Sequence, residues 1–389
     1  MDSKISEVHG FCNPRFIAVK EAFAKSFRAG KEIGASCAVT IDGEFVLDIW
    51  AGYSDANQTQ PWRKNTIVNV WSTTKGMIAL CAHMLVDRGL LDLDAPVAKY
   101  WPEFAQAGKE KLPVRYLLSH MSGLAGWDQP ISVTDLYDWD YLCGLLAKQS
   151  PWWEPGICAG YHALSFGYLI GEVVRRITGK SLGTFFQEEV AEPLHADFHI
   201  GLPMEFDLRV ADLIDYPTPI PGDVNYVNPE WVKVNFPIHA KTFLNSPVIS
   251  EEEIRSRRWR AAEIPASNGH GNARSVARVA SVLACGGEVN GIRLLSMSTI
   301  EKSIEEQFYG IDLSLMQPIR WGLGWGLKSP ERPISPHPRS FYWSGAGGSV
   351  VIMDLDARLS YAYVMNKMES GVAVKSRSMK LSEALYASL

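Results

Sequence analysis

The start of the chain has the hydrophobic pattern of an amphipathic helix followed by a hairpin. In residues 13–28, apolar side chains recur every three or four positions, which predicts a helix with one buried face. Residues 35–41 and 44–51 are rich in apolar and β-branched side chains and flank Asp42-Gly43, a dipeptide typical of tight hairpin turns. The sequence therefore predicts a helix and then two antiparallel strands.

The next segment predicts a helix that is buried on most of its sides. Residues 67–71 form a short extended run that leads to Ser72. From residue 73 to residue 88 the pattern is helical, and apolar residues occupy nearly every face. Gly89 marks the expected end of this helix.

Strand patterns return only near the end of the chain. They cover residues 320–327, 340–344, 348–354 and 359–365, and residues 372–388 close the chain as a helix. The long region before them is mostly helical, with connections rich in proline and tryptophan.

This order of elements predicts an α+β protein with two domains. Residues 1–89 and 316–389 are expected to form one discontinuous domain, an antiparallel sheet flanked by the N- and C-terminal helices. Residues 90–315 are expected to form an inserted, mainly helical domain. The cleft between two such domains is the natural place for a ligand.

Composition and charge exclude several classes of protein. The chain has 389 residues, a hydrophobic fraction of 47% and a formal net charge of −5, so no basic excess is present for binding nucleic acid. No run of 18 apolar residues occurs, which predicts no membrane span. Residues 1–10 lack the apolar core of a secretory signal, and the six cysteines are scattered without a metal-ligand spacing. We therefore expect a cytoplasmic protein with reduced thiols and no metal site.

The strongest chemical signal is Ser72 with Lys75 three residues later. Ser72 is the only serine in the chain with a lysine at this spacing, and it precedes the most apolar helix. Residues i and i+3 share a helix face, and the N–H groups of a helix N-terminus favour a developing oxyanion. A lysine walled by apolar side chains loses solvation, which favours the neutral amine that a general base requires. The alternative without a catalytic role is that Ser72 caps the helix and Lys75 lies on the protein surface.

A second serine lies in a G-x-S-x-G pattern. Ser181 is at its centre, but residues 165–178 before it are helical in pattern, whereas a nucleophile elbow follows a strand. We therefore interpret Ser181 as the N-cap of a short helix.

Several motifs together resemble one known superfamily. Ser72-x-x-Lys75 within VWSTTKGMIAL looks like the nucleophile motif of the serine β-lactamases and penicillin-binding proteins. Further segments resemble that superfamily in the same order along the chain: residues 89–97, residues 117–124 (LLSHMSGL), residues 155–171, residues 322–326 and residues 343–345. Among the branches of this superfamily, the chain most resembles the family VIII carboxylesterases, which share the fold of the class C β-lactamases.

The resemblance implies a role for each matching residue. Ser72 is the acylated nucleophile, and Lys75 holds its proton or shares it with Tyr161. Tyr161 is the general base and later the acid that protonates the leaving group. The backbone N–H groups of Ser72 and Ala346 form the oxyanion hole.

Two departures from the class C pattern affect the expected substrate. Ala163 stands where those enzymes carry asparagine, and Trp343-Ser344-Gly345 stands where they carry Lys-Thr-Gly. An indole cannot replace the positive charge that binds a substrate carboxylate. We therefore expect uncharged, apolar substrates.

The remaining aromatic and histidine residues receive weaker assignments. Five residues are expected to contact the substrate: Trp343, Ser344, Gly345, Trp127 and Trp153. His120 is interpreted as structural and His162 receives no role, so a Ser-His-Asp triad is a poor alternative.

The sequence thus predicts a serine carboxylesterase that hydrolyses short-chain, uncharged esters through an acyl-enzyme, with no cofactor. The expected partner is a small-molecule ester, with no nucleic acid or membrane partner, and no oligomeric state is predicted. The alternatives are an acyltransferase, an amidase or weak β-lactamase of the same fold, and a non-catalytic assembly protein.

Overall fold

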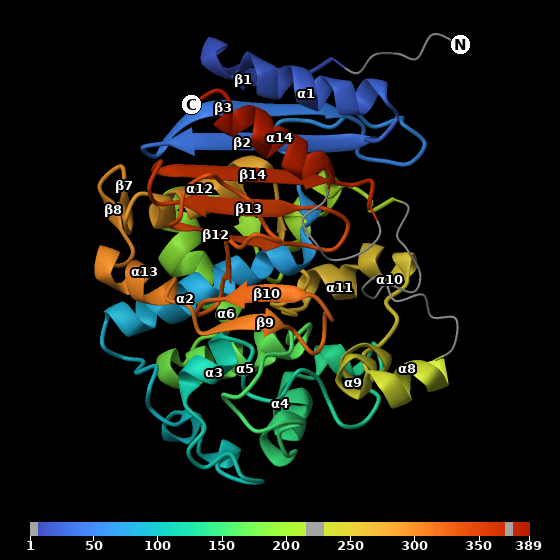
Figure 1. Ribbon diagram of the computed structural model, residues 1–389. Coiled ribbons are helices and arrows are strands. Elements are labelled where there is room, and N and C mark those ends of the chain that lie inside the picture. Colours follow the sequence, from blue (N-terminus) through green and yellow to red (C-terminus); the bar gives the residue numbers. More distant parts are fainter. Residues whose placement is uncertain (1–6, 215–228, 370–375) are drawn as a thin grey trace.

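A nine-stranded antiparallel sheet, built from both ends of the chain, is the main β element (Figure 1). The computed structural model describes residues 7–214, 229–369 and 376–389. The strand order is β1-β3-β2-β14-β13-β12-β11-β10-β9. The strands of this sheet are β1 (His9–Cys12), β2 (Gly34–Ile41), β3 (Glu44–Gly52), β9 (Phe308–Ile311), β10 (Pro318–Trp321), β11 (Gly326–Leu327), β12 (Ser340–Ser344), β13 (Val350–Asp354) and β14 (Leu359–Met365). Two small sheets contain β4 (Val68–Asn69), β5 (Phe198–His199) and β6 (His270–Gly271), and β7 (Glu288–Val289) and β8 (Ile292–Arg293).

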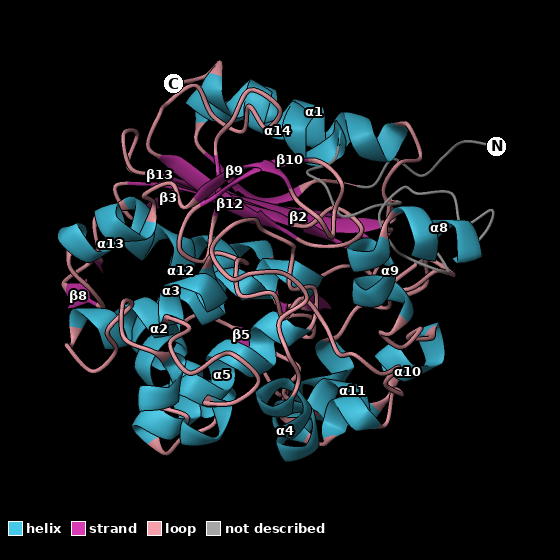
Figure 2. Cartoon of the chain, turned by 60° about the horizontal axis from the view of Figure 1, so that its bottom comes forward, coloured by secondary structure: helices cyan, strands magenta, loops and turns pink. Residues whose placement is uncertain are grey.

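Helices cover both faces of the large sheet (Figure 2). The terminal helices α1 (Ile17–Arg28) and α14 (Ser376–Tyr386) lie on one face, and α2 (Lys75–Asp87) and α12 (Ala273–Ala284) lie on the other. Because both faces are covered, β2, β13 and β14 are buried along nearly their whole length. The predicted antiparallel sheet flanked by terminal helices is confirmed.

The rest of the chain forms a mainly helical region below the sheet in Figure 1. Its helices are α3 (Val114–Leu118), α4 (Trp139–Lys148), α5 (Ser165–Thr178), α6 (Leu182–Phe186), α7 (Glu192–Leu194), α8 (Pro229–Asn235), α9 (Pro237–Leu244), α10 (Glu251–Arg255), α11 (Arg257–Ala261) and α13 (Met297–Ser303). β9 is a strand of the large sheet, and α12 packs against that sheet. The division into two domains with bounds at residues 89 and 315 stays a prediction. Ser360 Oγ on β14 donates to the Ala277 carbonyl of α12 at 2.8 Å.

Most of the predicted elements are present. The turn between β2 and β3 has positive φ at Asp42 (51°) and Gly43 (83°), as a tight hairpin requires. The side chains of α2 from Lys75 to Leu85 are all buried, as its apolar pattern predicts. The predicted C-terminal helix of residues 372–388 corresponds to α14, and residues 372–375 lie outside the described residues. The edge strands β1 and β9 were not predicted from the sequence.

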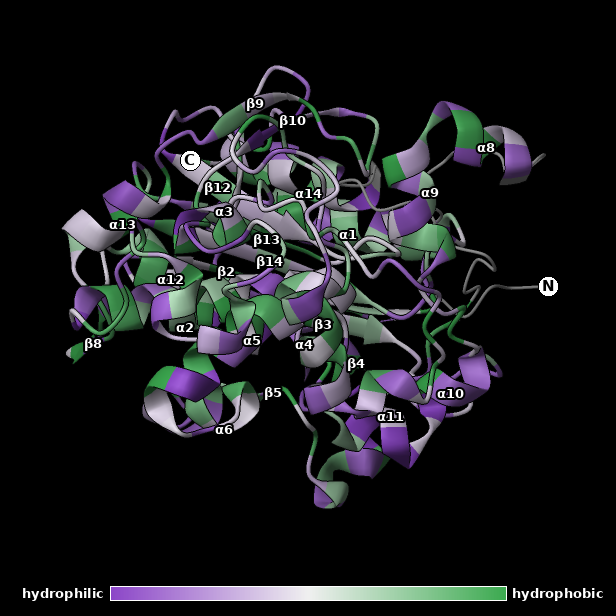
Figure 3. Cartoon of the chain, turned by 90° about the horizontal axis from the view of Figure 1, so that it is seen from below, coloured by the Kyte–Doolittle hydropathy of each residue, from purple (hydrophilic) through white to green (hydrophobic). Residues whose placement is uncertain are grey.

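Four arginines, Arg255, Arg257, Arg258 and Arg260, form a short basic run on α10 and α11. Both helices are mostly hydrophilic (Figure 3). Arg255 and Arg258 are substantially exposed and pair with Asp212 and Glu253. No helix of the described ranges combines the length and the apolar character needed to cross a bilayer.

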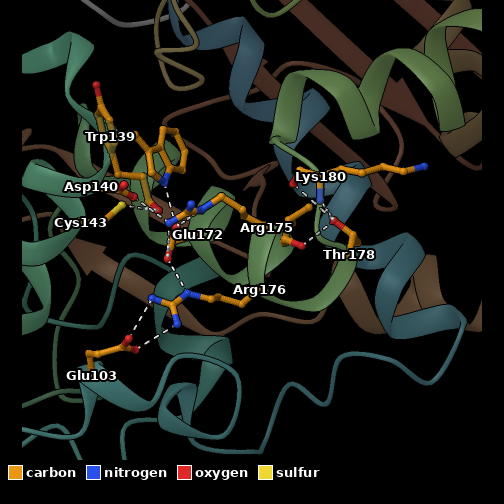
Figure 4. Close-up of polar contacts among 11 residues, drawn as sticks. Glu103, Trp139, Asp140, Cys143, Glu172, Arg175, Arg176, Thr178 and Lys180 are labelled. Carbon is orange, nitrogen blue, oxygen red and sulfur yellow. Dashed lines mark hydrogen bonds and ion pairs between the residues drawn. The ribbon is translucent and has the colours of Figure 1, made fainter.

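A buried carboxylate joins α5 to its neighbours (Figure 4). The side chain of Glu172 is 1% exposed and accepts hydrogen bonds from Trp139 Nε1 (2.8 Å), Arg175 Nε (2.7 Å) and Arg176 Nε (2.7 Å). Arg176 also pairs with Glu103. This cluster holds α5 in place, and the N-terminus of α5 lies shortly after Tyr161 in the chain.

Candidate active site

Ser72 lies in a single turn of 3-10 helix, Trp71–Thr74, directly before α2. Trp71 has φ +50°, a conformation that is costly for a bulky residue. Thr74 Oγ1 holds it by donating to the Trp71 carbonyl at 2.6 Å, and the Gly269 N–H donates to the same hydroxyl at 3.1 Å. The turn thus stores backbone strain at the residue before the nucleophile.

Lys75 is fully buried and faces Ser72. Its Nζ lies 3.1 Å from Ser72 Oγ and donates to the carbonyls of Ala163 (2.8 Å) and Ala266 (2.9 Å). Burial alone lowers the pKa of Lys75 well below its usual value. A neutral amine has two N–H groups, which the two carbonyls accept, and one lone pair, which is then left for the Ser72 proton.

Tyr161 is the second side chain that contacts Ser72 Oγ. Its hydroxyl donates to Ser72 Oγ at 2.7 Å. Burial raises the pKa of Tyr161, the hydrogen bond with Ser72 lowers it, and the Asp312 carboxylate raises it further, so the phenol stays protonated. These directions favour Lys75 as the base and Tyr161 as the acid, whereas the sequence analysis expected Tyr161 to act first as the base.

Two histidines hold the Tyr161 loop and take no part in a triad. His162 Nδ1 donates to the Gly160 carbonyl (2.6 Å), and its Nε2 accepts from Ser122 Oγ (2.6 Å). Burial lowers the pKa of His162 to about 3. The His162 N–H donates to His120 Nδ1 at 3.2 Å, and the His120 ring packs against Tyr161. The partners of Ser72 Oγ within the described ranges are Lys75 and Tyr161.

The segment after β12 is hydrogen-bonded to the turn that carries Ser72. Ser349 Oγ donates to the Val70 carbonyl at 2.8 Å and lies 2.9 Å from Thr73 Oγ1. A Cβ on Gly345 would lie 2.2 Å from the Val70 carbonyl oxygen, so only glycine fits there. Within the part of the chain that the structure describes, the N–H groups of Ser72 and Ala346 donate to no other backbone group. Both are therefore available to an oxyanion.

The aromatic residues divide into pocket and core. Trp343 and Ser344 line a pocket beside Tyr161, and the Trp343 indole donates to the Gly324 carbonyl at 2.6 Å. Trp127 is 1% exposed and donates to the Leu142 carbonyl, so its predicted substrate contact is corrected: it is a core residue. Trp153 donates to the Cys158 carbonyl and packs against the His162 ring behind the Tyr161 loop.

Ser181 is the helix cap that the sequence predicted. Its hydroxyl accepts from the Thr184 N–H at 3.2 Å and donates to Glu263 at 2.6 Å. It begins α6, and its hydroxyl bonds to Thr184 and Glu263, whereas Ser72 Oγ bonds to Lys75 and Tyr161.

Three polar residues of this region were missed by the sequence analysis. Asp312 is fully buried and accepts from the Tyr161 N–H at 2.9 Å. Arg332 and Gln317 line the same pocket as Trp343. None of the three lies in a distinctive motif, because Asp312 and Gln317 stand in ordinary loop sequence and Arg332 stands in a proline-rich connection.

Comparison with known proteins agrees with this geometry. The Beta-lactamase family profile matches residues 19–385. The chain belongs to the beta-lactamase family. Over 371 residues it is 35% identical to "Esterase/beta-lactamase LipL" of Mycobacterium tuberculosis, which covers 93% of this chain and 84% of that protein.

Solved structures of this family superpose closely on the chain. A "family VIII carboxylesterase" matches with a TM-score of 0.90 and 41% identity over 98% of this chain and 100% of the other. A penicillin-binding protein homologue from Caulobacter crescentus matches with a TM-score of 0.89 and 39% identity over the same shares. The predicted superfamily and fold are therefore confirmed.

Proposed function

We propose that this member of the beta-lactamase family is a serine carboxylesterase that acts through an acyl-enzyme on Ser72. The observation that carries the proposal is the position of Ser72 Oγ, 3.1 Å from a buried lysine amine and 2.7 Å from a buried phenol. The names of the similar proteins, an esterase and a family VIII carboxylesterase, support the reaction class.

The first proton transfers are proposed from the hydrogen bonds to Ser72 Oγ. Lys75 takes the Ser72 proton as Oγ attacks the ester carbonyl, and the Ser72 and Ala346 N–H groups stabilise the oxyanion. Tyr161 then donates its proton to the leaving alkoxide, and the proton held by Lys75 is proposed to return to Tyr161, whose ring centroid lies 4.8 Å from Lys75 Nζ. Water attacks the acyl-enzyme by the same route and releases the acid.

The acyl group is proposed to be short and uncharged. Trp343 occupies the position of the lysine in the class C pattern, and its indole nitrogen is already used by the Gly324 carbonyl.

All six cysteines are free, which supports the predicted cytoplasmic location.

The test is hydrolysis of p-nitrophenyl butyrate by the wild type, Ser72→Ala and Ser181→Ala. Loss of hydrolysis and of fluorophosphonate labelling in Ser72→Ala alone is the expected result, because Ser181 caps a helix elsewhere. Hydrolysis that survives in Ser72→Ala would overturn the proposal. Addition of an alcohol or amine acceptor separates hydrolysis from acyl transfer, since a transferase forms a new ester or amide.

A further inference from the structure

A small pocket adjoins the leaving-group side of the site. It measures about 30 Å³, room for a group of only a few heavy atoms. Its walls come from Tyr161 and from β10, β11, β12 and their connections, and they include Gln317, Trp321, Arg332, Tyr342 and Trp343. Tyr161 is the proposed proton donor to the leaving alkoxide, whereas Ser72 and Ala346 do not line this pocket. The proposed role of Tyr161 would place the alcohol part of the ester in this pocket.

Arg332 is the cationic group of this pocket, and its position is fixed by its neighbours. Arg332 and Ser329 exchange backbone hydrogen bonds (3.0 and 3.3 Å), which holds the base of the side chain. Arg332 Nη2 donates to Gln317 Oε1 at 2.6 Å, and the guanidinium faces the Tyr342 hydroxyl. The half-buried guanidinium is thus oriented by neutral groups.

Among residues 7–214, 229–369 and 376–389, no carboxylate forms an ion pair with this guanidinium, and Glu331 interacts with it only at longer range. The adjacent carboxylate of Glu331 accepts instead from the Tyr309 hydroxyl at 2.9 Å. A guanidinium has five N–H donors in a planar fork that matches a carboxylate, and neutral neighbours leave several of them unused.

We propose that Arg332 binds a carboxylate on the alcohol moiety, so that the substrates are short-chain acyl esters of hydroxy acids. The inference rests on the proposed function and narrows its substrate class. Ser72 Oγ forms a bond to the acyl carbon, the bond from that carbon to the alkoxy oxygen breaks, and the Tyr161 proton passes to this oxygen. The hydroxy acid leaves with its carboxylate unchanged, and water releases the acyl group.

This proposal revises the expectation of a wholly uncharged substrate. The missing lysine of the Lys-Thr-Gly position removes one positive charge, but Arg332 supplies another from the connection between β11 and β12. The acyl group remains uncharged, and the charge lies on the part of the substrate that leaves first.

The test compares acetoxyacetate, the acetyl ester of glycolate, with its neutral analogue acetoxyacetamide, and likewise the acetyl ester of lactate with that of lactamide, because these small alcohol parts match the size of the pocket. The measured quantity is the ratio of their kcat/KM values, divided by the ratio of their alkaline hydrolysis rates. The wild type is expected to favour the carboxylate at least tenfold, and Arg332→Gln is expected to lower the ratio about ten- to hundredfold. Arg332→Lys is expected to retain part of the preference because the charge remains.

Arg320→Gln is the matched control. Arg320 lies on β10 next to Trp321 but does not line the pocket, and it pairs with Glu306 at 2.6 Å. The control is expected to keep the wild-type ratio. If the ratio responded to any loss of positive charge or of stability, Arg320→Gln would lower it as well.

Two results would overturn the inference: a wild type without preference for the carboxylate, or an Arg332→Gln ratio equal to that of the wild type. In either case hydrolysis of phenyl acetate that requires Ser72 leaves the proposed esterase function intact. Absence of hydrolysis of every ester, together with absence of Ser72 labelling, overturns the function itself.

Discussion

The carboxylate of Asp312 connects the proposed acid Tyr161 to the indole of Trp321. Its Oδ1 accepts from the Tyr161 N–H at 2.9 Å, and its Oδ2 accepts from Trp321 Nε1 at 3.0 Å. The rings of Tyr161 and Trp321 lie nearly parallel, with an interplanar angle of 6°. One buried carboxylate therefore positions the acid and the aromatic wall of the leaving-group pocket together.

We expect Asp312→Asn to lower kcat with a smaller change in KM. The amide keeps one acceptor oxygen for the Tyr161, Ser314 and Leu315 N–H groups and turns its NH₂ group toward Trp321, so the indole and the phenol shift. Asp312→Ala leaves all these donors unpaired and should cost about 3–5 kcal/mol of folding stability. Steady-state kinetics and thermal unfolding check both variants. Unchanged kcat in a folded Asp312→Asn enzyme would contradict the positioning role.

Gly345→Ala tests the placement of the oxyanion hole. The new Cβ would lie 2.2 Å from the Val70 carbonyl oxygen and 2.3 Å from Ser349 Oγ, so the backbone must move and carry the Ala346 N–H away from Ser72. We expect kcat for p-nitrophenyl butyrate to fall about 10²–10³-fold, the effect of losing one oxyanion donor.

Gly144→Ala in α4 is the control for this substitution, because a Cβ there meets no atom within 4 Å. Its activity should be unchanged, and its stability should rise by about 0.5–1 kcal/mol since alanine favours the helix. Equal kcat for Gly345→Ala and the wild type would remove Ala346 from the oxyanion hole.

The sequence predicted the reacting residues better than their surroundings. Ser72 lies in the 3-10 turn and Lys75, three residues later, begins the apolar helix α2, so local spacing alone brings the two side chains together. Tyr161 was placed only by its order among the family segments. Asp312 and Arg332 reach the site from loops far along the chain, and no local pattern distinguishes them from surface residues.

Tryptophan positions were the least predictable part of the site. Trp127 and Trp343 are both buried, and only Trp343 was placed at the site by a family segment, whereas the sequence shows Trp127 simply as a large aromatic side chain. The register of β12 decides that Trp343 faces Tyr161, and the loop before α4 decides that Trp127 faces Leu142. Both features depend on long-range pairing, which hydrophobic periodicity does not encode.

Glu172→Gln is expected to destabilise the helical region without reducing activity. Burial alone would raise the pKa of Glu172, but hydrogen bonds from Arg175, Trp139 and Arg176 bring it below its usual value. The carboxylate therefore stabilises the fold above its unfolded pKa, and this stabilisation is lost as the pH falls through the lower folded pKa. We expect a loss of about 2–4 kcal/mol at pH 7, because two arginines lose a buried partner.

Urea unfolding at pH 7 and pH 3 measures this difference, which should shrink at the lower pH. The control is Glu188→Gln, since Glu188 pairs with Lys180 on the surface (side chains 45% and 40% exposed) and solvent screening should make its contribution to stability small. Equal effects of the two variants at pH 7 would contradict the buried-pair argument.

The pH profile of kcat/KM distinguishes the two assignments of the base. Burial lowers the pKa of Lys75 and raises that of Tyr161, so the active form has a neutral amine and a protonated phenol. With a neutral ester, kcat/KM should fall on the acid side as Lys75 gains its proton and should stay level up to pH ~10, because the phenol keeps its proton there. Lys75→Arg should be inactive at every pH, since a guanidinium does not lose its proton. If a Tyr161 phenolate were the base instead, the enzyme would be active with a charged residue at position 75. A folded Lys75→Arg variant would then show measurable turnover, and its kcat/KM would still fall at low pH.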